Sequence, residues 1–300
     1  MGVERVVLGC GNFGGVGSDL RLAGHGENAD EAFALMDAAW ARGVRRFDTA
    51  SSYGGGRSEE MIGAWIRARR PERLSLTSKA FHPVYDGDDE GLAPARVRRV
   101  VRDSLARLGV ERIDLYLVHE PDPSTPLART LATLGELVDE GAIGAIGVSN
   151  VDGRHLEQAL ALAPIAVVQN EYSLLVRDSE RDVLPLCAEH GIEFQVFSPL
   201  AGGWLTGKYE RGAQFPAGSR MTLRPDPYAG FVREEVFDSL EQLEQRGDPA
   251  TLSLAWLLAN PLVGAVVVGP RSAAHLESVW AALELGVDRA ELTGLFTWSR

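Results

Sequence analysis

The strongest constraint on the fold is a regular alternation of short apolar runs with amphipathic helical stretches along nearly the whole chain. Runs of this kind, bounded by turn residues, are typical of strands buried on both faces of a parallel sheet. The expected strands are Val6–Leu8, Val44–Asp48, Leu74–Ser78, Ile113–Val118, Ile143–Val148, Ala166–Gln169, Ile192–Phe197 and Val263–Val268. Eight strands that alternate with helices in 300 residues predict an α/β fold, a (β/α)₈ TIM barrel with residues 1–300 in a single domain.

The stretches between these runs carry the start and stop signals of helices. In "SEEMIGAWIRARR" and "PARVRRVVRDSLARLG" the apolar residues recur at helical spacing. Pro94 and Pro126 stand where helices should start, and glycine follows several of the expected helices, as at Gly43, Gly109, Gly141 and Gly191. The Gly/Pro-rich stretch from Ala201 to Gly230 is longer than an ordinary loop, and such loops are usually functional or disordered. We therefore predict a barrel with a long loop after the seventh strand.

An open doubly wound sheet is the competing fold. The segment "VVLGCGNFGG" contains G-x-G-x-x-G at Gly9, Gly11 and Gly14, which is the spacing of a dinucleotide fingerprint. That fingerprint requires a helix directly after the loop, because the helix N-terminus holds the pyrophosphate. The residues that follow, "GVGSDLRLAGHGENAD", have no helical periodicity, and the first convincing helix begins near Ala29. The context therefore favours the barrel over a Rossmann unit.

Composition excludes several classes of partner. The chain has 30 Lys and Arg against 42 Asp and Glu, and its net charge of −12 argues against nucleic acid or an anionic membrane as a general partner. Cys10 and Cys187 are the only cysteines, too few for a disulfide framework or a structural zinc site. The six histidines show no clustered ligand spacing, so no metal is expected. With no signal peptide and no apolar run near the ~20 residues of a membrane span, we expect a cytoplasmic protein.

Ionisable side chains close three successive predicted strands, where barrel active sites collect. The second strand ends at Asp48, with Tyr53 shortly after it, the third ends at Lys79, and the fourth ends at His119. Taken singly, Asp48 could cap a turn and His119 could be a histidine of the barrel rim. Lys79 is harder to explain in this way, because a lysine that closes an apolar strand needs an anionic partner or a ligand. Together the four predict a catalytic pocket.

These residues and their surroundings resemble the aldo-keto reductase superfamily over nearly the whole chain, in the manner of its longer-loop bacterial-type members. Asp48, Tyr53, Lys79 and His119 stand in the order of the catalytic tetrad of that superfamily. Similar motifs are "FDTASSYGGGRSEEMIG" at the second strand, "GVSN" and "QNEYSLL" at the fifth and sixth, "FSPLAGGWLTGKY" in the seventh loop and "GPRSAAHLES" at the cofactor end. The opening "LGCGNFGG" matches a Gly-rich segment that passes near the nicotinamide and substrate. The resemblance implies NADP(H) bound on a barrel, without a Rossmann domain.

Carbonyl reduction requires a hydride at carbon, which the cofactor supplies, and a proton at oxygen. Tyr53 is the expected general acid, and a general acid works best when its pKa lies nearer the operating pH than the value of about 10 for free tyrosine. We expect Lys79 to stabilise the phenolate and lower the pKa of Tyr53, and Asp48 to hold Lys79 charged. His119 is expected to donate a hydrogen bond to the substrate carbonyl oxygen. This predicts NADPH-dependent reduction of an aldehyde or ketone, including a sugar-derived one.

The resemblance also implies which residues bind the cofactor. Ser149, Asn150 and Gln169 would hold the nicotinamide carboxamide, and Phe197 occupies the stacking position, where any aromatic face suffices. The segment that wraps the pyrophosphate would use Ser198, Leu200, Gly202, Leu205 and Lys208, and the cofactor end would use Gly269, Arg271, Ser272 and His275. Arg271 and Ser272 suit a 2′-phosphate, since arginine offers charge-assisted hydrogen bonds. The chain departs from the family at His275 and Ser278-Val279, which predicts weaker adenine binding.

The residues that would surround the substrate lie in loops and specify it poorly. Phe13, Phe81, Tyr85 and Tyr228 are expected to supply apolar walls. Asp86, Asp88, Asp89 and Glu90 could discourage anionic substrates, although a solvated acidic loop is the simpler interpretation. The expected partner is a small carbonyl compound, and the oligomeric state is not specified.

Other functions fit the same residues. One is an NAD(P)-dependent sugar or alcohol dehydrogenase that works in the oxidative direction. Another is a non-catalytic module in which bound cofactor reports redox state to a partner protein. A non-redox barrel acting on a sugar phosphate does not explain why Tyr53 and "GVSN" occur together.

Overall fold

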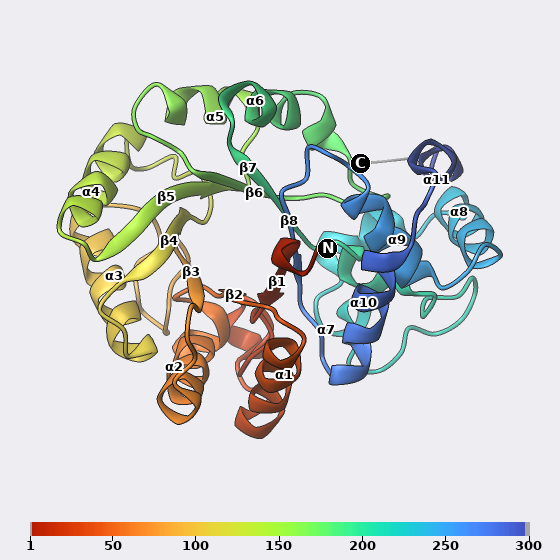
Figure 1. Ribbon diagram of the computed structural model, residues 1–300, viewed down its shortest axis with the longest axis horizontal. Helices are drawn as coiled ribbons and strands as arrows, with labels where there is room; N and C mark the ends of the chain where they lie inside the picture. Colours follow the sequence, from red (N-terminus) through yellow and green to blue (C-terminus); the bar gives the residue numbers. More distant parts are fainter. Residues whose placement is uncertain (1, 298–300) are drawn as a thin grey trace.

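The computed structural model describes residues 2–297, in which eight parallel strands close into a barrel in sequence order (Figure 1). The strands are β1 Val6–Gly9, β2 Arg46–Asp48, β3 Ser75–Ala80, β4 Ile113–Val118, β5 Ile143–Ser149, β6 Val167–Glu171, β7 Glu193–Phe197 and β8 Ala265–Val268. Closure is between the first and last strands, with Val6 opposite Val266 and Leu8 opposite Val268. The predicted fold class, a TIM barrel with a long segment after strand 7, is confirmed.

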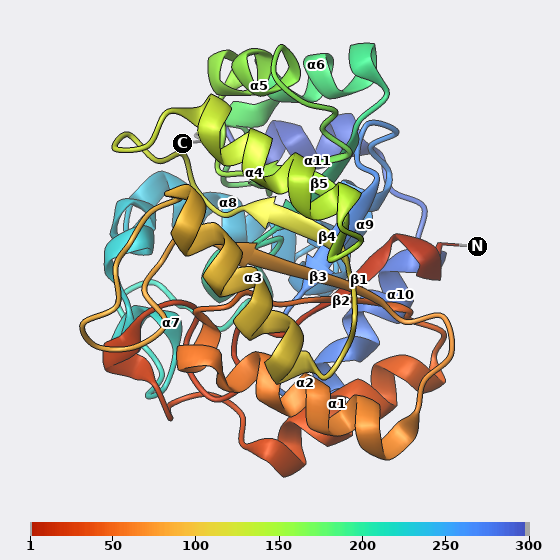
Figure 2. The ribbon, with the colours of Figure 1, turned by 90° about the vertical axis from the view of Figure 1, so that its left-hand side faces the viewer.

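Helices cover the outside of the barrel, and in Figure 2 α3 and α4 lie over β3 to β5. The helices are α1 Ala29–Ala41, α2 Arg57–Arg69, α3 Pro94–Leu108, α4 Leu127–Asp139, α5 Gly153–Leu160, α6 Val183–His190, α7 Arg220–Leu223, α8 Glu234–Glu244, α9 Pro249–Leu258, α10 Glu277–Glu284 and α11 Arg289–Leu295. Capping residues determine where several of these helices begin or end. Asn28 and Glu31 form a capping box at the start of α1, and α3 runs from Pro94 to a left-handed C-cap at Gly109.

The main core lies between the strands and the inner faces of these helices. Trp65 of α2 is fully buried against Phe47 of β2, with ring centroids 5.3 Å apart. The inside of the barrel is filled by small apolar layers, one of Val7, Ala265 and Val267 and one of Leu115, Leu117 and Val167. The barrel is therefore packed, and its chemistry has to occur at a rim.

The Rossmann alternative is excluded, because the sheet closes and no α-helix follows the glycine motif directly. The chain passes instead through a short 3₁₀ turn, Leu20–Leu22, before α1 begins at Ala29 as expected. Several predicted strand starts were one or two residues early. The second strand begins at Arg46 and the eighth at Ala265, because Val44 and Val263 lie in turns at the N-terminal rim even though both are buried.

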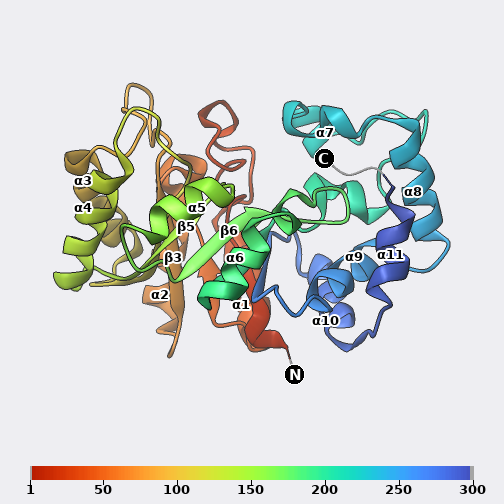
Figure 3. The ribbon, with the colours of Figure 1, turned by 90° about the horizontal axis from the view of Figure 1, so that it is seen from above.

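The long segment after β7 is ordered for much of its length. It forms the 3₁₀ turns Ala201–Thr206 and Asp226–Phe231 around α7, and Trp204 anchors it among Tyr209, Phe231 and Phe237. Figure 3 shows α7 to α11 gathered on one side of the barrel and α2 to α4 on the other. The segment is thus a small added layer beside the β7–β8 side of the barrel.

Within residues 2–297, no helix is long and apolar enough to cross a membrane. The same residues contain no group of three or more His, Cys, Asp or Glu side chains placed to hold a metal ion.

Candidate active site

The four side chains singled out at strand ends come together at one rim. Asp48 is the last residue of β2, Lys79 lies one residue before the end of β3, and His119 directly follows β4. Tyr53 begins the 3₁₀ turn Tyr53–Gly56 that follows β2. In a closed parallel barrel the carboxyl ends of all strands meet at one rim, and in Figure 2 the arrowhead of β4 points toward the side on which α7 lies.

Lys79 is the centre of the cluster and is 1% exposed. Its Nζ donates to Asp48 Oδ1 at 2.5 Å and to the carbonyl oxygen of Thr49 at 2.9 Å. A third hydrogen bond, at 3.3 Å, reaches the hydroxyl oxygen of Tyr53. The anionic partner that a buried lysine requires is therefore Asp48, and the ammonium group is directed at the phenol.

Electrostatics keep Lys79 charged and Tyr53 protonated. Burial lowers the pKa of Lys79, but the charge of Asp48 and contact with Tyr53 outweigh this effect and raise that pKa above its ordinary value. For Tyr53, burial raises the pKa, the charge of Lys79 lowers it and Asp48 raises it again, with a net increase. The expected lowering of the pKa of Tyr53 is thus wrong, because burial and Asp48 together exceed the effect of Lys79.

His119 faces the phenol, with ring centroids 5.6 Å apart and an interplanar angle of 77°. Burial holds the pKa of His119 well below its ordinary value, and the nearby Lys79 and His82 lower it further. The imidazole is therefore neutral near pH 7 and has one N–H to donate. Its Nδ1 is buried without a hydrogen-bond partner among the described residues.

The glycine-rich opening segment supports the turn that carries Tyr53. Gly54 has a φ of 59°, and a Cβ on it would lie 2.7 Å from the carbonyl oxygen of Phe13. A Cβ on Gly15 would lie 2.6 Å from the Cα of Gly54. The backbones at Gly15 and Gly54 are in contact, so the glycine-rich motif that suggested a dinucleotide loop packs instead against the turn that carries Tyr53.

The residues expected at the nicotinamide end lie beside the tetrad. Asn150, with a left-handed φ of 57°, donates from Nδ2 to the carbonyl oxygen of His119 at 2.9 Å and to Ser149 Oγ at 3.2 Å. Gln169 donates from Nε2 to Asp48 Oδ2 at 2.8 Å and to Gln195 Oε1 at 3.1 Å. The amide of Gln169 thus also fixes the second oxygen of Asp48, a positioning contact that no sequence motif indicated.

The residues after β7 differ in their surroundings. Phe197 packs on the apolar layer inside the barrel, and Ser198 has a left-handed φ of 52°. Leu200 and Gly202 lie in the following turn, where a Cβ on Gly202 would be 2.4 Å from the ring of Tyr228. The side chain of Leu205 is fully buried in the main core, and its predicted contact with the cofactor stays a prediction.

Three cations converge above β8. Burial lowers the pKa of Lys208, and Arg220 and Arg271 lower it further, which places these positive charges close together. Arg220 donates to the side-chain oxygen of Asn12. Arg271 donates from Nε to Glu27 Oε1 at 3.1 Å and from Nη1 to the carbonyl oxygen of Gly218 at 2.9 Å. The cluster suits an anionic ligand.

Asn12, Glu27 and Arg220 were missed by sequence reasoning. Arg220 had a usable signal, a cation inside the Gly/Pro-rich segment, whereas Glu27 and Asn12 meet the cluster only through the tertiary fold.

The cofactor-end residues surround Arg271. Gly269, Ser272 and His275 are exposed after β8, and His275 Nδ1 accepts from the backbone N–H of Arg271 at 3.2 Å. Ser278 donates to Asp248 Oδ2 at 3.2 Å, and Val279 is buried in the core. Both side chains are thus engaged within the protein, and weaker adenine binding stays a prediction.

The residues expected around the substrate differ in burial. Tyr85 is 57% exposed, whereas Phe13, Phe81 and half-buried Tyr228 are shielded. Asp88 is not part of a solvated acidic loop, because its carboxylate is buried against Arg96 and Arg99 at 3.3 and 2.5 Å. These contacts brace the loop after β3. His82 lies beside the tetrad, with its ring centroid 4.9 Å from that of His119.

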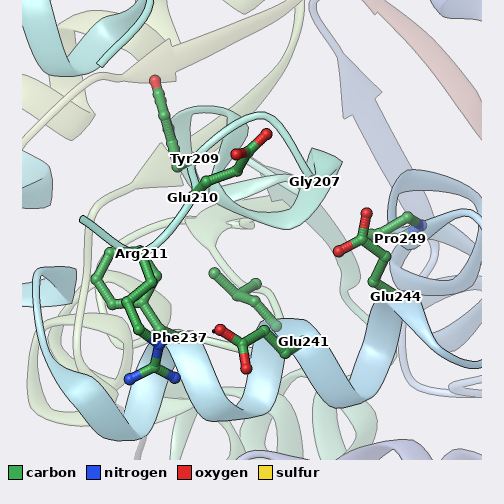
Figure 4. Close-up of a pocket in the computed structure, with 9 residues that line it drawn as sticks. Gly207, Tyr209, Glu210, Arg211, Phe237, Glu241, Glu244 and Pro249 are labelled. Atoms are coloured by element: carbon green, nitrogen blue, oxygen red, sulfur yellow. Dashed lines mark hydrogen bonds and ion pairs between the residues drawn. The ribbon is translucent and has the colours of Figure 1, made fainter. Parts of the chain in front are cut away.

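A separate cavity of about 340 Å³ lies between Gly207–Arg211 and α8 (Figure 4). It is lined by Gly207, Tyr209, Glu210, Arg211, Phe237, Leu240, Glu241, Glu244 and Pro249. None of the tetrad lines this cavity, so the chemistry of the four residues belongs to the rim and not to this pocket.

Comparison with known proteins gives consistent matches. The model of the Aldo/keto reductase family matches residues 5–295. The oxidoreductase YrpG of Bacillus subtilis is 34% identical, over 96% of this chain and 89% of that protein. An NADH-specific methylglyoxal reductase of Escherichia coli is 33% identical, over 84% of this chain and 82% of that protein. The structure of a glycerol dehydrogenase from Gluconobacter oxydans superposes with a TM-score of 0.80 at 27% identity, covering 97% and 90% of the two chains.

Proposed function

The chain belongs to the aldo/keto reductase family, and on that premise we propose that it reduces an aldehyde or ketone to the alcohol with NADPH, with Tyr53 as the general acid. The family uses NAD(P)H, and the choice of NADPH is part of the proposal. The observation that carries it is the hydrogen-bonded series Asp48–Lys79–Tyr53 facing His119 at the rim of the barrel.

Each of the four residues has a separate task. Tyr53 donates the proton to the carbonyl oxygen, and the ammonium group of Lys79, 3.3 Å from the phenol oxygen, stabilises the phenolate that remains. Asp48 keeps Lys79 charged and in place through the 2.5 Å contact. His119 is assigned to orientation because its low pKa makes it neutral near pH 7, when it can donate a hydrogen bond but carries no extra proton to transfer.

The residues of the rim fit a nicotinamide dinucleotide. Lys208, Arg220 and Arg271 form a group of cations with one carboxylate, Glu27, among them, which suits the pyrophosphate and a 2′-phosphate. Ser149, Asn150 and Gln169 offer amide and hydroxyl groups for the carboxamide, beside Phe197. Ser198, Leu200, Gly202, Gly269, Ser272 and His275 complete the proposed contacts. When bound, the cofactor supplies the hydride.

The substrate is proposed to be a small carbonyl compound. The methylglyoxal reductase and the glycerol dehydrogenase among the similar proteins act on small oxygenated molecules by their names, which supports this class. The similarity to a dehydrogenase also favours a second candidate, oxidation of a sugar or alcohol on the same residues. Relative rates of reduction and oxidation across matched carbonyl–alcohol pairs separate the two.

The experiment that tests the proposal compares the native protein with Tyr53→Phe. Quenching of tryptophan fluorescence by NADPH and NADH gives the dissociation constants, and a panel of aldehydes and ketones gives kcat. Tyr53→Phe should lower kcat by about 10²- to 10⁴-fold, the usual contribution of a general acid, while cofactor binding changes little. Tyr85→Phe is the matched control, since it removes an equivalent hydroxyl from an exposed side chain.

Weaker NADPH binding with unchanged turnover in Tyr53→Phe would contradict the assignment. Tight cofactor binding without turnover across the whole panel would favour the cofactor-sensing module instead.

A further inference from the structure

A buried acidic side chain lies inside the cationic cluster. Glu27, between β1 and α1, has a side chain that is 3% exposed. Its Oε1 accepts from Nε of Arg271, while its Oε2 is buried without a partner among the described residues. Burial raises the pKa of this carboxyl, although the hydrogen bond from Arg271 opposes the shift. The pair therefore places a carboxylate with an unused oxygen beside the arginine proposed to bind a phosphate.

The guanidinium group of Arg271 already uses two of its five N–H donors within the protein. Nε donates to Glu27 and Nη1 donates to the carbonyl oxygen of Gly218, while the side chain as a whole is 51% exposed. A phosphate dianion that approaches Arg271 can use the remaining N–H donors, but it meets the negative charge of Glu27 close by. The arginine is thus accessible, but its attraction for an anion is reduced by its neighbour.

Dinucleotide-binding sites distinguish NAD from NADP with these same two residue types, an acidic residue and an arginine. An acidic side chain accepts a hydrogen bond from the ribose 2′-hydroxyl of NAD, whereas an arginine accommodates the 2′-phosphate of NADP. Here one residue of each kind is present, and the two are paired. We propose that Glu27 is a specificity-determining residue that limits the preference for NADPH over NADH by opposing the 2′-phosphate at Arg271. This inference rests on the proposed use of a nicotinamide cofactor.

The test uses ligands without the nicotinamide, so that only the adenosine end is measured. Isothermal titration calorimetry with 2′,5′-ADP and 5′-ADP gives the effect of the 2′-phosphate directly and requires no turnover. The native protein should bind 2′,5′-ADP less than about tenfold more tightly than 5′-ADP, a difference below about 1.4 kcal/mol. Glu27→Gln keeps an acceptor for Arg271 and removes the charge, and it should strengthen 2′,5′-ADP binding by about tenfold. Binding of 5′-ADP should change by less than about threefold.

Asp30→Asn is the matched control, because it removes the same charge from an exposed residue three positions away and should leave both affinities unchanged. The inference is overturned if Glu27→Gln leaves the ratio of affinities unchanged or lowers it, which would make Glu27 a support for Arg271. If Glu27→Gln does not fold, as judged by thermal unfolding, the native ratio decides, and a preference of a hundredfold for 2′,5′-ADP overturns the inference. If the native protein binds neither these probes nor NAD(P)H, the proposed function fails instead.

Discussion

Replacement of Asp48 by Asn should destabilise the protein through one identifiable cause, a buried charge left without its partner. Asp48 accepts from Lys79 through Oδ1 and from Gln169 through Oδ2, at 2.5 and 2.8 Å. Asparagine has one acceptor oxygen, so one of these two donors loses its partner. Lys79 is 1% exposed and gains no water in exchange. Breaking a buried pair of this kind typically costs about 3–5 kcal/mol, and we expect a loss of that size in the free energy of unfolding.

The loss of stability in Asp48→Asn should depend on pH, because Lys79 titrates. In the native protein the pKa of Lys79 is raised, so the ammonium form is stable in the fold. In Asp48→Asn the raising effect of Asp48 is lost, and we expect burial, the largest single influence, to outweigh the remaining contact with Tyr53 and to lower that pKa below its unfolded value of about 10.4. A base whose folded pKa is lowered loses stability as the pH falls, because the unfolded state binds more protons. The difference between native and Asp48→Asn should therefore be larger at pH 7 than at pH 10.

Equilibrium urea unfolding at the two pH values measures this difference. The second variant, Asp48→Asn with Lys79→Met, removes the orphaned charge and should recover most of the lost stability. If the double variant is no more stable than Asp48→Asn, the unpaired ammonium group is not the cause and the reasoning is refuted.

Three further predictions follow from other contacts in the structure. Arg107→Ala should lower the free energy of unfolding by about 3–5 kcal/mol, because Glu59 is fully buried and, among the described residues, would keep only the hydrogen bond from Ser78. Arg98→Ala, at an exposed pair, should lower it far less in the same urea titration. Gly54→Ala should lower both thermal stability and kcat. Gly54 has a left-handed φ of 59°, and an added Cβ would lie 2.7 Å from the Phe13 carbonyl oxygen, so the turn that carries Tyr53 has to shift. Unchanged kcat would show that this turn does not set the position of the phenol. His119→Asn should reduce the loss of stability between pH 6.5 and pH 5. Because the pKa of His119 is lowered in the folded protein, folding releases a proton in this pH range, which is worth up to about 1.4 kcal/mol per pH unit. Parallel curves of stability against pH for the two proteins would contradict this.

The sequence by itself determined the barrel and singled out the four side chains that meet at its rim. Eight apolar runs separated by helical periodicity leave few alternatives, because parallel strands need crossover helices and both faces of the sheet have to be covered. The absence of a helix after Gly14 was enough to reject the Rossmann alternative, and the closed sheet confirms this. The tetrad could be named because its members end successive strands, and parallel strands bring such residues to one rim. The assignment of residues 1–300 to one domain and the roles of the site residues stay predictions.

Only the tertiary structure decided how charges meet across elements distant in the chain. The pKa of Tyr53 was expected to fall, yet burial and Asp48 raise it, since the net shift depends on depth and on every neighbouring charge. Asp88 was expected in a solvated acidic loop, but its carboxylate is buried and pairs with Arg96 and with the partly exposed Arg99. Glu27 meets Arg271, 244 positions along the chain, because the closing of β8 onto β1 places their loops together. The hydrophobic periodicity of a sequence indicates which face of a helix or strand is buried. It does not indicate which side chains from different loops lie together in one site.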